Sequence, residues 1–282
     1  MAMLGDLFTQ FQRDRKLKQW NKMIHAGTQF AFADGPERYL IPVTDDDLGS
    51  QLFIYGEAEF SKVSVAMGLL KRSHVGRFVD VGANVGHIVI PGLKRGLFEL
   101  GVAIEPDLTN FGCLAINAQM NGVTERIQLV HAAAGNGEAS KLKLALASSE
   151  FGDHRIAVGP ELAKTRRVVE VPATTIDEVA SGLDRSTDLV WMDIQGYEVT
   201  ALRGAEDARA ARVPIVIEFW PEGILATGEC LMNLVSLLSE YREFADLSLS
   251  SARFQTLEDL PKLWASLLSG QRGRGYVDIL LK

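Results

Sequence analysis

Two acidic residues and a glycine-containing turn are the part of this sequence best suited to binding a nucleotide-like ligand. Asp80 lies near the end of an apolar run, FVDVG, and the turn that follows holds Gly82 and Gly86 with Asn84 between them. Glycine has no Cβ, so it permits positive φ and lets a ligand approach the backbone closely. Glu105 ends the next apolar run, where an acid can accept hydrogen bonds from ribose hydroxyls. The spacing favours a ligand site over a plain tight turn between a strand and a helix.

The turn departs from the pattern of a dinucleotide site. That pattern is GxGxxG, whereas this chain reads GANVGH, with Asn84 at the middle position and the last glycine displaced. A carboxylate at Asp80 would repel a pyrophosphate but would suit a ligand with an ammonium or a sulfonium group. We therefore expect S-adenosylmethionine rather than NAD as the cofactor. The residues expected to bind it are Asp80, Gly82, Ala83, Asn84, Gly86, Glu105, Pro106, Asn110, Ala132, Ala133 and Asp193.

The elements that must position these residues follow an alternating pattern. From residue 77, near-continuous apolar runs alternate with segments of helical periodicity, which predicts a mostly parallel sheet with helices on both faces. The expected strands are 77–82, 101–106, 126–133, 188–195, 213–220, 243–249 and 276–282. The expected helices are 60–73, 85–97, 108–122, 197–211, 229–241 and 257–268. Residues 135–171 interrupt the alternation and read as a hairpin-like insertion with a polar loop at 148–164.

The first 54 residues read as an extension to this fold. A helix comes first, then short strands at 28–33 and 38–43, and a polar-to-apolar connection that leads to residue 59. The expected division is an extension at 1–54 and a cofactor-binding domain at 55–282. Apolar residues of the first helix, Leu4 and Phe8 among them, favour docking on the protein's own body over a membrane-surface or partner helix.

Composition narrows the class of protein. The chain has 282 residues, is 47% hydrophobic and has a formal net charge of -7, so general binding to nucleic acid is disfavoured. It has two cysteines, outside any CxxC pattern, and no apolar run long enough to span a membrane. The N-terminus lacks the apolar core of a signal peptide. We expect a cytoplasmic enzyme without stable membrane insertion and without a metal, and a homo-oligomer stays open.

Several stretches together resemble the FkbM-type S-adenosylmethionine-dependent methyltransferases. They are YGEAE (55–59), FVDVGANVGH (78–87), AIEPDLTN (103–110), HAAAGNGEA (131–139), VPATTIDEV (171–179), DLVWMDIQGYEVTALRGA (188–205) and PIVIEF (214–219). The resemblance implies a class I, Rossmann-like methyltransferase fold with a seven-stranded sheet whose last strand is antiparallel. It also implies O-methylation of a hydroxyl on a small molecule such as a sugar, a glycolipid or a polyketide-like product. Gln195 departs from the family pattern D-x-E-G-x-E, which has an acid at that position.

Methyl transfer to an alcohol requires in-line placement of the reacting atoms and a base for the hydroxyl proton. Asp193, at the end of a strand, is the first candidate, with a helix N-cap as the alternative. His87 is a candidate base or a packing histidine. Glu218, followed by Trp220, is a candidate for holding a polyol acceptor. The alternative is that Glu218 is an acid with satisfied hydrogen bonds above an ordinary core. Asp193, His87 and Glu218 are therefore the catalytic candidates.

Three further residues are assigned from their surroundings. His131 is expected near the adenine, and His154 on a surface loop rather than on a lid. Glu198 is expected to cap its own helix or to reach the crevice. The competing functions are transfer to a nitrogen or a protein side chain, a nicotinamide-dependent oxidoreductase, and a non-catalytic binding protein with a nucleotide fold.

Overall fold

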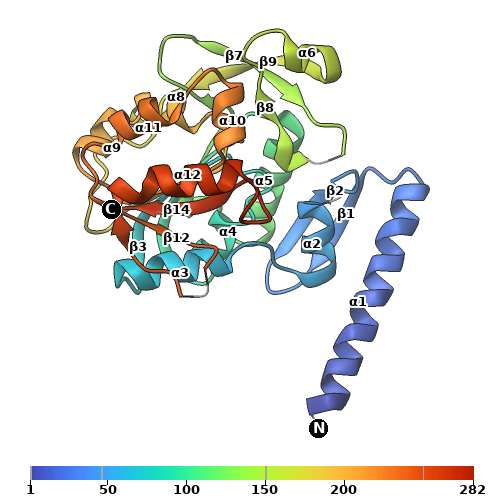
Figure 1. Cartoon of the computed structure of the whole chain (residues 1–282). Coiled ribbons are helices and arrows are strands. Elements are labelled where there is room, and N and C mark those ends of the chain that lie inside the picture. The colour runs from blue at the N-terminus through green and yellow to red at the C-terminus, as the bar shows by residue number, and fades with distance from the viewer. Residues whose placement is uncertain (1, 46, 150, 250) are drawn as a thin grey trace.

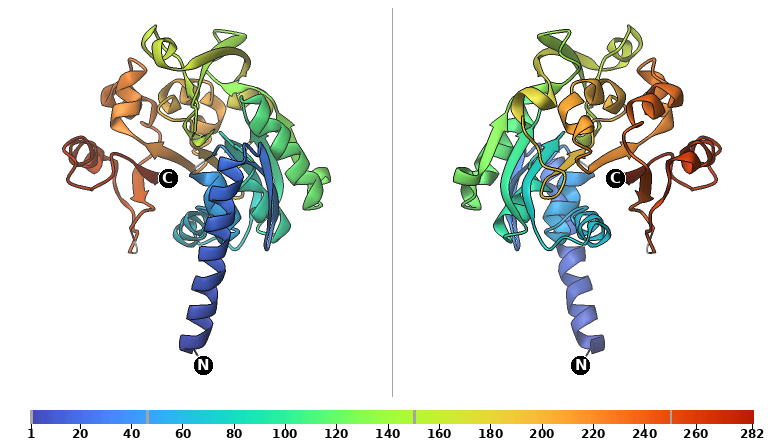
Figure 2. Two further views of the ribbon diagram at one scale, coloured as in Figure 1. Left: turned by 90° about the vertical axis from the view of Figure 1, so that its right-hand side faces the viewer. Right: turned by 90° about the vertical axis from the view of Figure 1, so that its left-hand side faces the viewer.

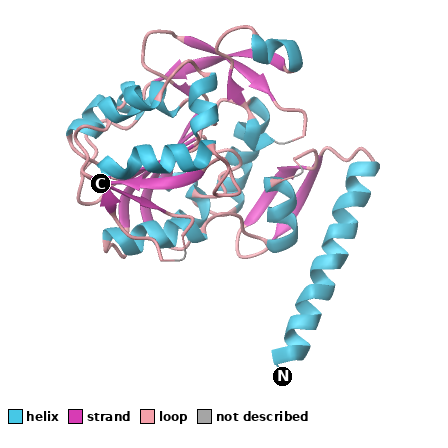
Figure 3. Ribbon diagram, in the orientation of Figure 1, coloured by secondary structure: helices cyan, strands magenta, loops and turns pink. Residues whose placement is uncertain are grey.

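The structure is a computed structural model that describes residues 2–45, 47–149, 151–249 and 251–282. A large mixed sheet with helices on both sides forms the body, and a small second sheet lies beside it (Figures 1 and 3). At the N-terminus, a helix and a two-stranded hairpin are attached to the body (Figure 1). The architecture confirms the predicted α/β, Rossmann-like class.

The large sheet has eight strands in the order β13-β12-β14-β11-β10-β3-β4-β5. Their bounds are β3 (Val75–Val81), β4 (Phe98–Ile104), β5 (Ile127–Val130), β10 (Leu189–Met192), β11 (Ile215–Phe219), β12 (Glu243–Asp246), β13 (Gln255–Thr256) and β14 (Val277–Leu281). Strand β14 runs antiparallel to β11 and β12, which confirms the expected antiparallel last strand. The eighth strand, β13, was not expected, because two residues are too few to give a periodic signal.

Strand order reverses between β3 and β10. From β3 the chain proceeds to β4 and β5 on one side of the sheet, and it later returns through β10 and β11 on the other. β3 and β10 are parallel neighbours, so the segments that follow them start from the same edge of the sheet. Ligands of open α/β sheets bind in the crevice at such a point. Gly82 and Asp193, which follow these two strands, therefore lie where a site is expected.

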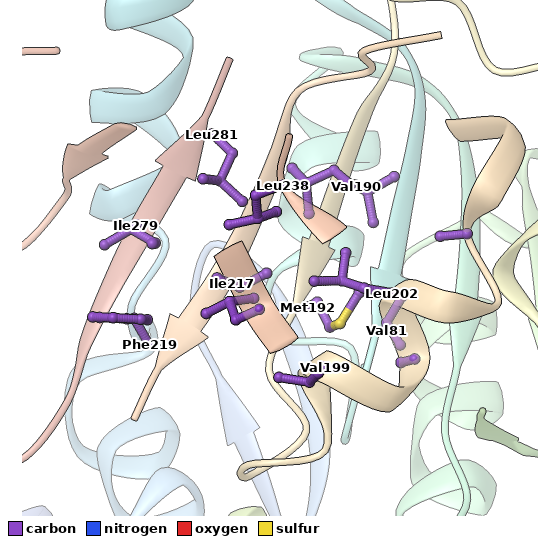
Figure 4. Close-up of a cluster of buried hydrophobic side chains, with 14 of the residues drawn as sticks. Val81, Val190, Met192, Val199, Leu202, Ile217, Phe219, Leu238, Ile279 and Leu281 are labelled. Carbon is purple, nitrogen blue, oxygen red and sulfur yellow. The ribbon is translucent and has the colours of Figure 1, made fainter. Parts of the chain in front are cut away.

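Helices cover both faces of the large sheet through two clusters of buried apolar side chains. One face packs against α3 (Ser61–Leu70), α4 (Val89–Lys94) and α5 (Leu108–Met120). The other packs against α7 (Ile176–Val179), α8 (Glu198–Arg203), α9 (Glu206–Ala210), α10 (Pro221–Ala226), α11 (Leu231–Leu237) and α12 (Leu260–Leu268). Figure 4 shows Met192 and Ile217 of the sheet beside Leu202 of α8, and all three are fully buried. Each such side chain contributes about 1.5–3 kcal/mol to the free energy of unfolding.

Several helices differ from the prediction. Residues 197–211 form two helices instead of one, because the chain bends at Gly204, where a Cβ would lie 2.1 Å from the carbonyl oxygen of Gly135. The connection after residue 44 contains a helix, α2 (Leu48–Tyr55). Helix α10, with Pro221 in its first turn, and the short α7, which has a capping box, were not expected either. Single 3-10 turns lie at η1 (Thr124–Arg126) and η3 (Leu257–Asp259).

The insertion forms a second sheet, in the order β6-β9-β7-β8. It comprises β6 (Ala133–Ala134), β7 (Lys141–Leu146), β8 (Arg155–Ile156) and β9 (Arg167–Thr174), with η2 (Phe151–Asp153) and α6 (Glu161–Thr165). β7 pairs antiparallel with β9 and with β8, so the expected hairpin-like insertion is confirmed. The polar loop at 148–164 holds η2, β8 and most of α6 rather than being without structure.

The N-terminal helix α1 (Ala2–His25) projects away from the body, with the N-terminus at its far end (Figures 1 and 2). Among its described side chains, Trp20 is buried, and its ring packs against Phe53 of α2 at 5.4 Å between centroids. Phe11 is 68% exposed, so the expected docking of the helix on the body holds only for its C-terminal part. The side chains of Leu4 and Phe8 lie outside the described residues.

The hairpin of β1 (Phe30–Asp34) and β2 (Arg38–Pro42) docks on the body through Asn117 of α5. The side-chain oxygen of Asn117 accepts from the Leu40 amide at 2.6 Å, and its amide donates to the Val85 carbonyl at 2.9 Å. One side chain thus links the hairpin to the turn after β3. Among the described residues, no helix combines the length and the apolar character needed to cross a membrane. The domain boundary at residue 54 stays a prediction.

Candidate active site

Two adjoining cavities lie at the carboxyl ends of the sheet strands. The larger has a volume of about 390 Å³, and a narrower one continues from it. The residues that line both are Gly82, Asn84, Gly152, Asp193 and Gln195. One crevice with a narrow and a wide part can therefore hold two ligands side by side.

The walls of the narrower cavity are mostly small and apolar, and its two acids are Glu105 and Asp193. Its lining includes Ile104, Glu105, Pro106, Ala132, Ala133, Leu144 and Ile156. The two carboxylate oxygens of Glu105 accept from the backbone amides of Asn84 and Asp107, each at 2.8 Å. Burial raises the pKa of Glu105 to about 8, although these two hydrogen bonds act in the opposite direction. The acid is thus fixed rigidly below the turn, and each of its oxygens keeps a second lone pair.

The turn after β3 divides its predicted residues into two groups. Gly82 (φ 87°) and Asn84 (φ 50°) line the cavities. Ala83 and Gly86 are not among the lining residues, and a Cβ on Gly86 would lie 2.5 Å from Cδ1 of Ile90. Gly86 is therefore needed for packing of the turn on α4, which differs from its expected approach to a ligand.

Asp80 and Asn110 also lie apart from the cavities that the described residues form. Asp80 is 2% exposed, and it accepts a hydrogen bond from the backbone amide of Val89 at the start of α4. Burial raises the pKa of Asp80 to about 7. Asn110 is buried in α5, whose N-cap is Asp107. Asp80 therefore does not line either cavity, and its expected role in binding the cofactor stays a prediction.

Asp193 and Glu218 both line the larger cavity, and their catalytic role stays a prediction. The side-chain amide of Gln195 lies between them and donates to Oδ1 of Asp193 at 2.8 Å and to Oε2 of Glu218 at 3.2 Å. Burial and the charges of Glu59 and Asp278 raise the pKa of Asp193 to about 6. Burial and the charge of Asp193 raise the pKa of Glu218 well above its ordinary value. One carboxyl of this pair is therefore far easier to ionise than two.

The loop that carries Gln195 is held in an unusual conformation. Gln195 has φ 57°, a left-handed value that costs a residue other than glycine about 1 kcal/mol. Glu198, which is fully buried, accepts from the amides of Ile194 and Gly196 at 3.1 and 3.2 Å. It thus fixes the loop at the start of its own helix, as one of its two predicted roles required. A Cβ on Gly196 would lie 2.5 Å from the backbone of Gly223, so the loop is seated on α10.

His87 lies in the wall of the larger cavity and contacts an acid. Its Nε2 is 3.6 Å from Oε2 of Glu59, and the ammonium of Lys62 bonds the other oxygen of Glu59 at 2.6 Å. Lys62 also bonds Asp278 at 2.5 Å. Burial raises the pKa of Glu59, but His87 and Lys62 outweigh it, so this pKa lies well below the ordinary value. Glu59 is therefore an ionised acceptor that orients the imidazole.

The insertion supplies one wall through Asp153 and Arg155. Arg155 bonds the Asp153 carboxylate at 2.5 Å, and its guanidinium carbon lies 4.4 Å from the ring centroid of Trp220. His154 lines the narrow cavity, which corrects its expected place on a surface loop. His131 is not in either lining and bonds the Pro106 carbonyl at 3.1 Å, so it lies behind the predicted adenine position. Among the described residues, no three His, Cys, Asp or Glu side chains are grouped so as to hold a metal ion.

Several cavity residues were not predicted. Glu59 lies two residues before α3, Lys62 lies in the first turn of α3, and Asp278 comes from β14. The signal for Glu59 was the YGEAE stretch, which marked the position without indicating a role. Tyr276 and Glu222 also line the cavity, and no motif in the sequence marks them.

Comparisons with known proteins give a family match. The model of the methyltransferase FkbM domain matches residues 80–241. A search of curated proteins found no match. Among solved structures, the methyltransferase FkbM from Methylobacillus flagellatus KT has 20% identity and a TM-score of 0.43, with 80% of this chain and 52% of that one covered. This chain thus spans about half the length of that protein.

Two further solved structures contain a cofactor or its product. M. jannaschii TYW2 in complex with AdoMet has 12% identity and a TM-score of 0.42, with 90% of this chain and 85% of that one covered. The tRNA (uracil-54, C5)-methyltransferase of Pyrococcus abyssi, in complex with S-adenosyl-L-homocysteine, has 13% identity and a TM-score of 0.43. The coverage there is 90% of this chain and 44% of that one.

Proposed function

Because the chain belongs to the FkbM family of methyltransferases, we propose that this S-adenosylmethionine-dependent enzyme methylates a hydroxyl group of a small-molecule acceptor in the larger cavity. The observation that carries the proposal is the pair of adjoining cavities, which share the turn after β3 and the Asp193–Gln195 segment. One cavity is narrow and largely apolar, and the other is wide and lined by carboxylates. A nucleoside and a polar acceptor would then meet at the shared residues.

The residues of the narrow cavity suit the adenosine part of S-adenosylmethionine. Ala132 and Ala133 leave a flat space, and Glu105 can accept hydrogen bonds from ribose hydroxyls on its remaining lone pairs. Oδ1 of Asn84, which is 6% exposed, has no hydrogen-bond partner among the described residues. A buried acceptor without a donor costs about 1–3 kcal/mol, so a donor on a bound ligand would stabilise this position.

The bound cofactor supplies a methyl group on a positively charged sulfur, and the chain must prepare the acceptor oxygen. We assign the hydroxyl proton to Asp193, whose Oδ1 is held by Gln195 while its other oxygen can face the acceptor. Its raised pKa makes it a stronger base than an ordinary aspartate while leaving it mostly ionised at neutral pH. Glu218 would hold a second acceptor hydroxyl, and His87, oriented by Glu59, is the alternative base.

Titration calorimetry with S-adenosylhomocysteine tests the cofactor part of the proposal. Glu105→Gln should weaken binding at least about tenfold, because the amide nitrogen of glutamine cannot accept a hydrogen bond from a ribose hydroxyl. The matched control is Glu99→Gln in β4, the strand that leads to Glu105; the Glu99 side chain is 68% exposed, and the affinity of this variant should equal that of the native protein. Absence of binding by the native protein would reject the proposal. Product analysis then separates a methyl ether from a methylated amine or a methylated protein.

A further inference from the structure

The larger cavity has a strong excess of carboxylates over cations. Its carboxylates are Asp45, Asp47, Glu59, Asp153, Asp193, Glu218, Glu222 and Asp278. Its permanently cationic side chains are Lys62 and Arg155. A cavity of this charge attracts cations and repels phosphates and carboxylates.

Both cationic side chains in this lining already pair with carboxylates of the protein. Lys62 lies between Glu59 and Asp278, with its Nζ at 2.6 and 2.5 Å from their oxygens. Arg155 bonds Asp153. Between Asp193 and Glu218, by contrast, the described residues place the uncharged amide of Gln195. An amide cannot neutralise a carboxylate, and Lys62, whose charge also acts on Asp193, is bonded to Glu59 and Asp278 instead.

Independent features of the same cavity also indicate a missing ligand. Asn84 and His87 are 6% and 8% exposed, and Oδ1 of Asn84 and Nδ1 of His87 have no hydrogen-bond partner among the described residues. The rings of Trp220 and Tyr276 lie in the wall. The guanidinium of Arg155 lies over the Trp220 ring, so this aromatic face already accepts a cation. The cavity therefore offers acceptors and aromatic surface at once.

We propose that the acceptor is a cationic polyol, a hydroxylated amine of the amino-sugar or aminocyclitol class, whose ammonium group pairs with Glu218 while Asp193 faces the hydroxyl to be methylated. This inference rests on the proposed function. The sulfonium of the cofactor would supply one positive charge beside the residues that line both cavities. The other carboxylates of the larger cavity would then remain to bind the acceptor. An acceptor bearing a phosphate or a carboxylate would lie against acids on several sides.

The protonation of the site adds a measurable consequence. Burial and the charge of Asp193 raise the pKa of Glu218 well above its ordinary value, so this carboxyl holds a proton to higher pH than an ordinary glutamate does. An ammonium beside Glu218 favours the ionised carboxylate, so binding of a cationic ligand should release a proton to the buffer. A neutral polyol would accept the hydrogen bond of the protonated acid and would release none.

The experiment is calorimetry on the full chain saturated with S-adenosylhomocysteine, with three matched probes: glucosamine, glucose and glucuronate. We expect glucosamine to bind at least about tenfold more tightly than glucose, and glucuronate to bind most weakly. Titrations in buffers of different ionisation enthalpy should show proton release with glucosamine alone. Glu218→Gln should abolish the preference, and Glu222→Gln should reduce it severalfold. The control Glu206→Gln, on the exposed start of α9, should leave it unchanged.

The outcomes separate this inference from the proposed function. Binding of S-adenosylhomocysteine together with equal or absent binding of the three sugars overturns the cationic acceptor and leaves the methyltransferase proposal intact. Tightest binding of glucuronate, or glucosamine binding without proton release, also overturns it. Failure of S-adenosylhomocysteine to bind overturns the proposed function itself.

Discussion

The buried carboxyl of Asp80 gives a prediction about stability that can be worked out in detail. Its pKa is about 7 in the folded protein because of burial, against an ordinary value of 3.8. Between these two values the folded state holds a proton that the unfolded state has lost, so the free energy of unfolding must fall as pH rises. Each unit is worth about 1.4 kcal/mol. From about pH 5 to pH 7, Asp80 should therefore lower stability by about 2–3 kcal/mol, with little further change above pH 8.

Asp80→Asn removes this titration while keeping an oxygen that can accept from the Val89 amide. Urea denaturation at about pH 5, 6, 7 and 8 measures the free energy of unfolding of both proteins. The variant should gain about 2–3 kcal/mol on the native protein between about pH 5 and pH 8. The matched control is Asp34→Asn, a carboxylate with an 83% exposed side chain, whose difference from the native protein should stay constant with pH. Parallel curves for Asp80→Asn and the native protein would refute the assignment of a buried, protonated Asp80.

Three other changes test the site and its supports. Asp193→Asn should lower kcat at least about a hundredfold, with less than a threefold change in affinity for S-adenosylhomocysteine. The kcat of the native protein should rise with pH through the Asp193 pKa of about 6. Equal rates for the variant and the native protein in a single-turnover assay would contradict the role of Asp193 as base. Gly196→Ala should lower the free energy of unfolding by at least about 3 kcal/mol, because the added Cβ would meet the Gly223 backbone. Gly159 also has a positive φ but faces open space, so Gly159→Ala should lower the free energy of unfolding by about 1 kcal/mol. A similar loss in both would show that the loop is not seated on α10. Asn117→Ala should lower the stability by about 2 kcal/mol and increase amide exchange at Leu40; unchanged exchange would contradict its link to the hairpin.

The sequence was informative wherever burial forces a simple pattern. Strands such as β3 and β10 are buried along most of their length, so their apolar runs stand out, and the glycine turn marks the edge at which the site forms. Helix α2 was missed because its first turn follows a polar segment around Asp47. The break at Gly204 depends on Gly135, which is distant in the chain, and no local pattern can report such a contact.

The location of the candidate site could be predicted from the sequence, but many of the residues that line it could not. A residue's place in a strand fixes its distance from the edge, but a one-residue shift changes the face to which the side chain is directed. The sequence therefore cannot tell whether Asp80 reaches the crevice, and in the structure its carboxyl is buried and lines neither cavity. Glu59, Lys62 and Asp278 come together from a helix and the last strand, so their grouping exists only after folding. Gln195 departs from the family pattern D-x-E-G-x-E, but that pattern does not show that its amide lies between two acids.

The position of β14 inside the sheet has a consequence for biosynthesis. This strand is inserted between β11 and β12, and residue pair Glu218 and Asp278 lies across the first of these junctions. A ribosome-bound chain that has not yet released residues 277–281 can pair β3, β4, β5, β10 and β11 but must leave an open edge beside β11. Since unpaired edges promote association between chains, nascent molecules should depend on chaperones until this strand arrives.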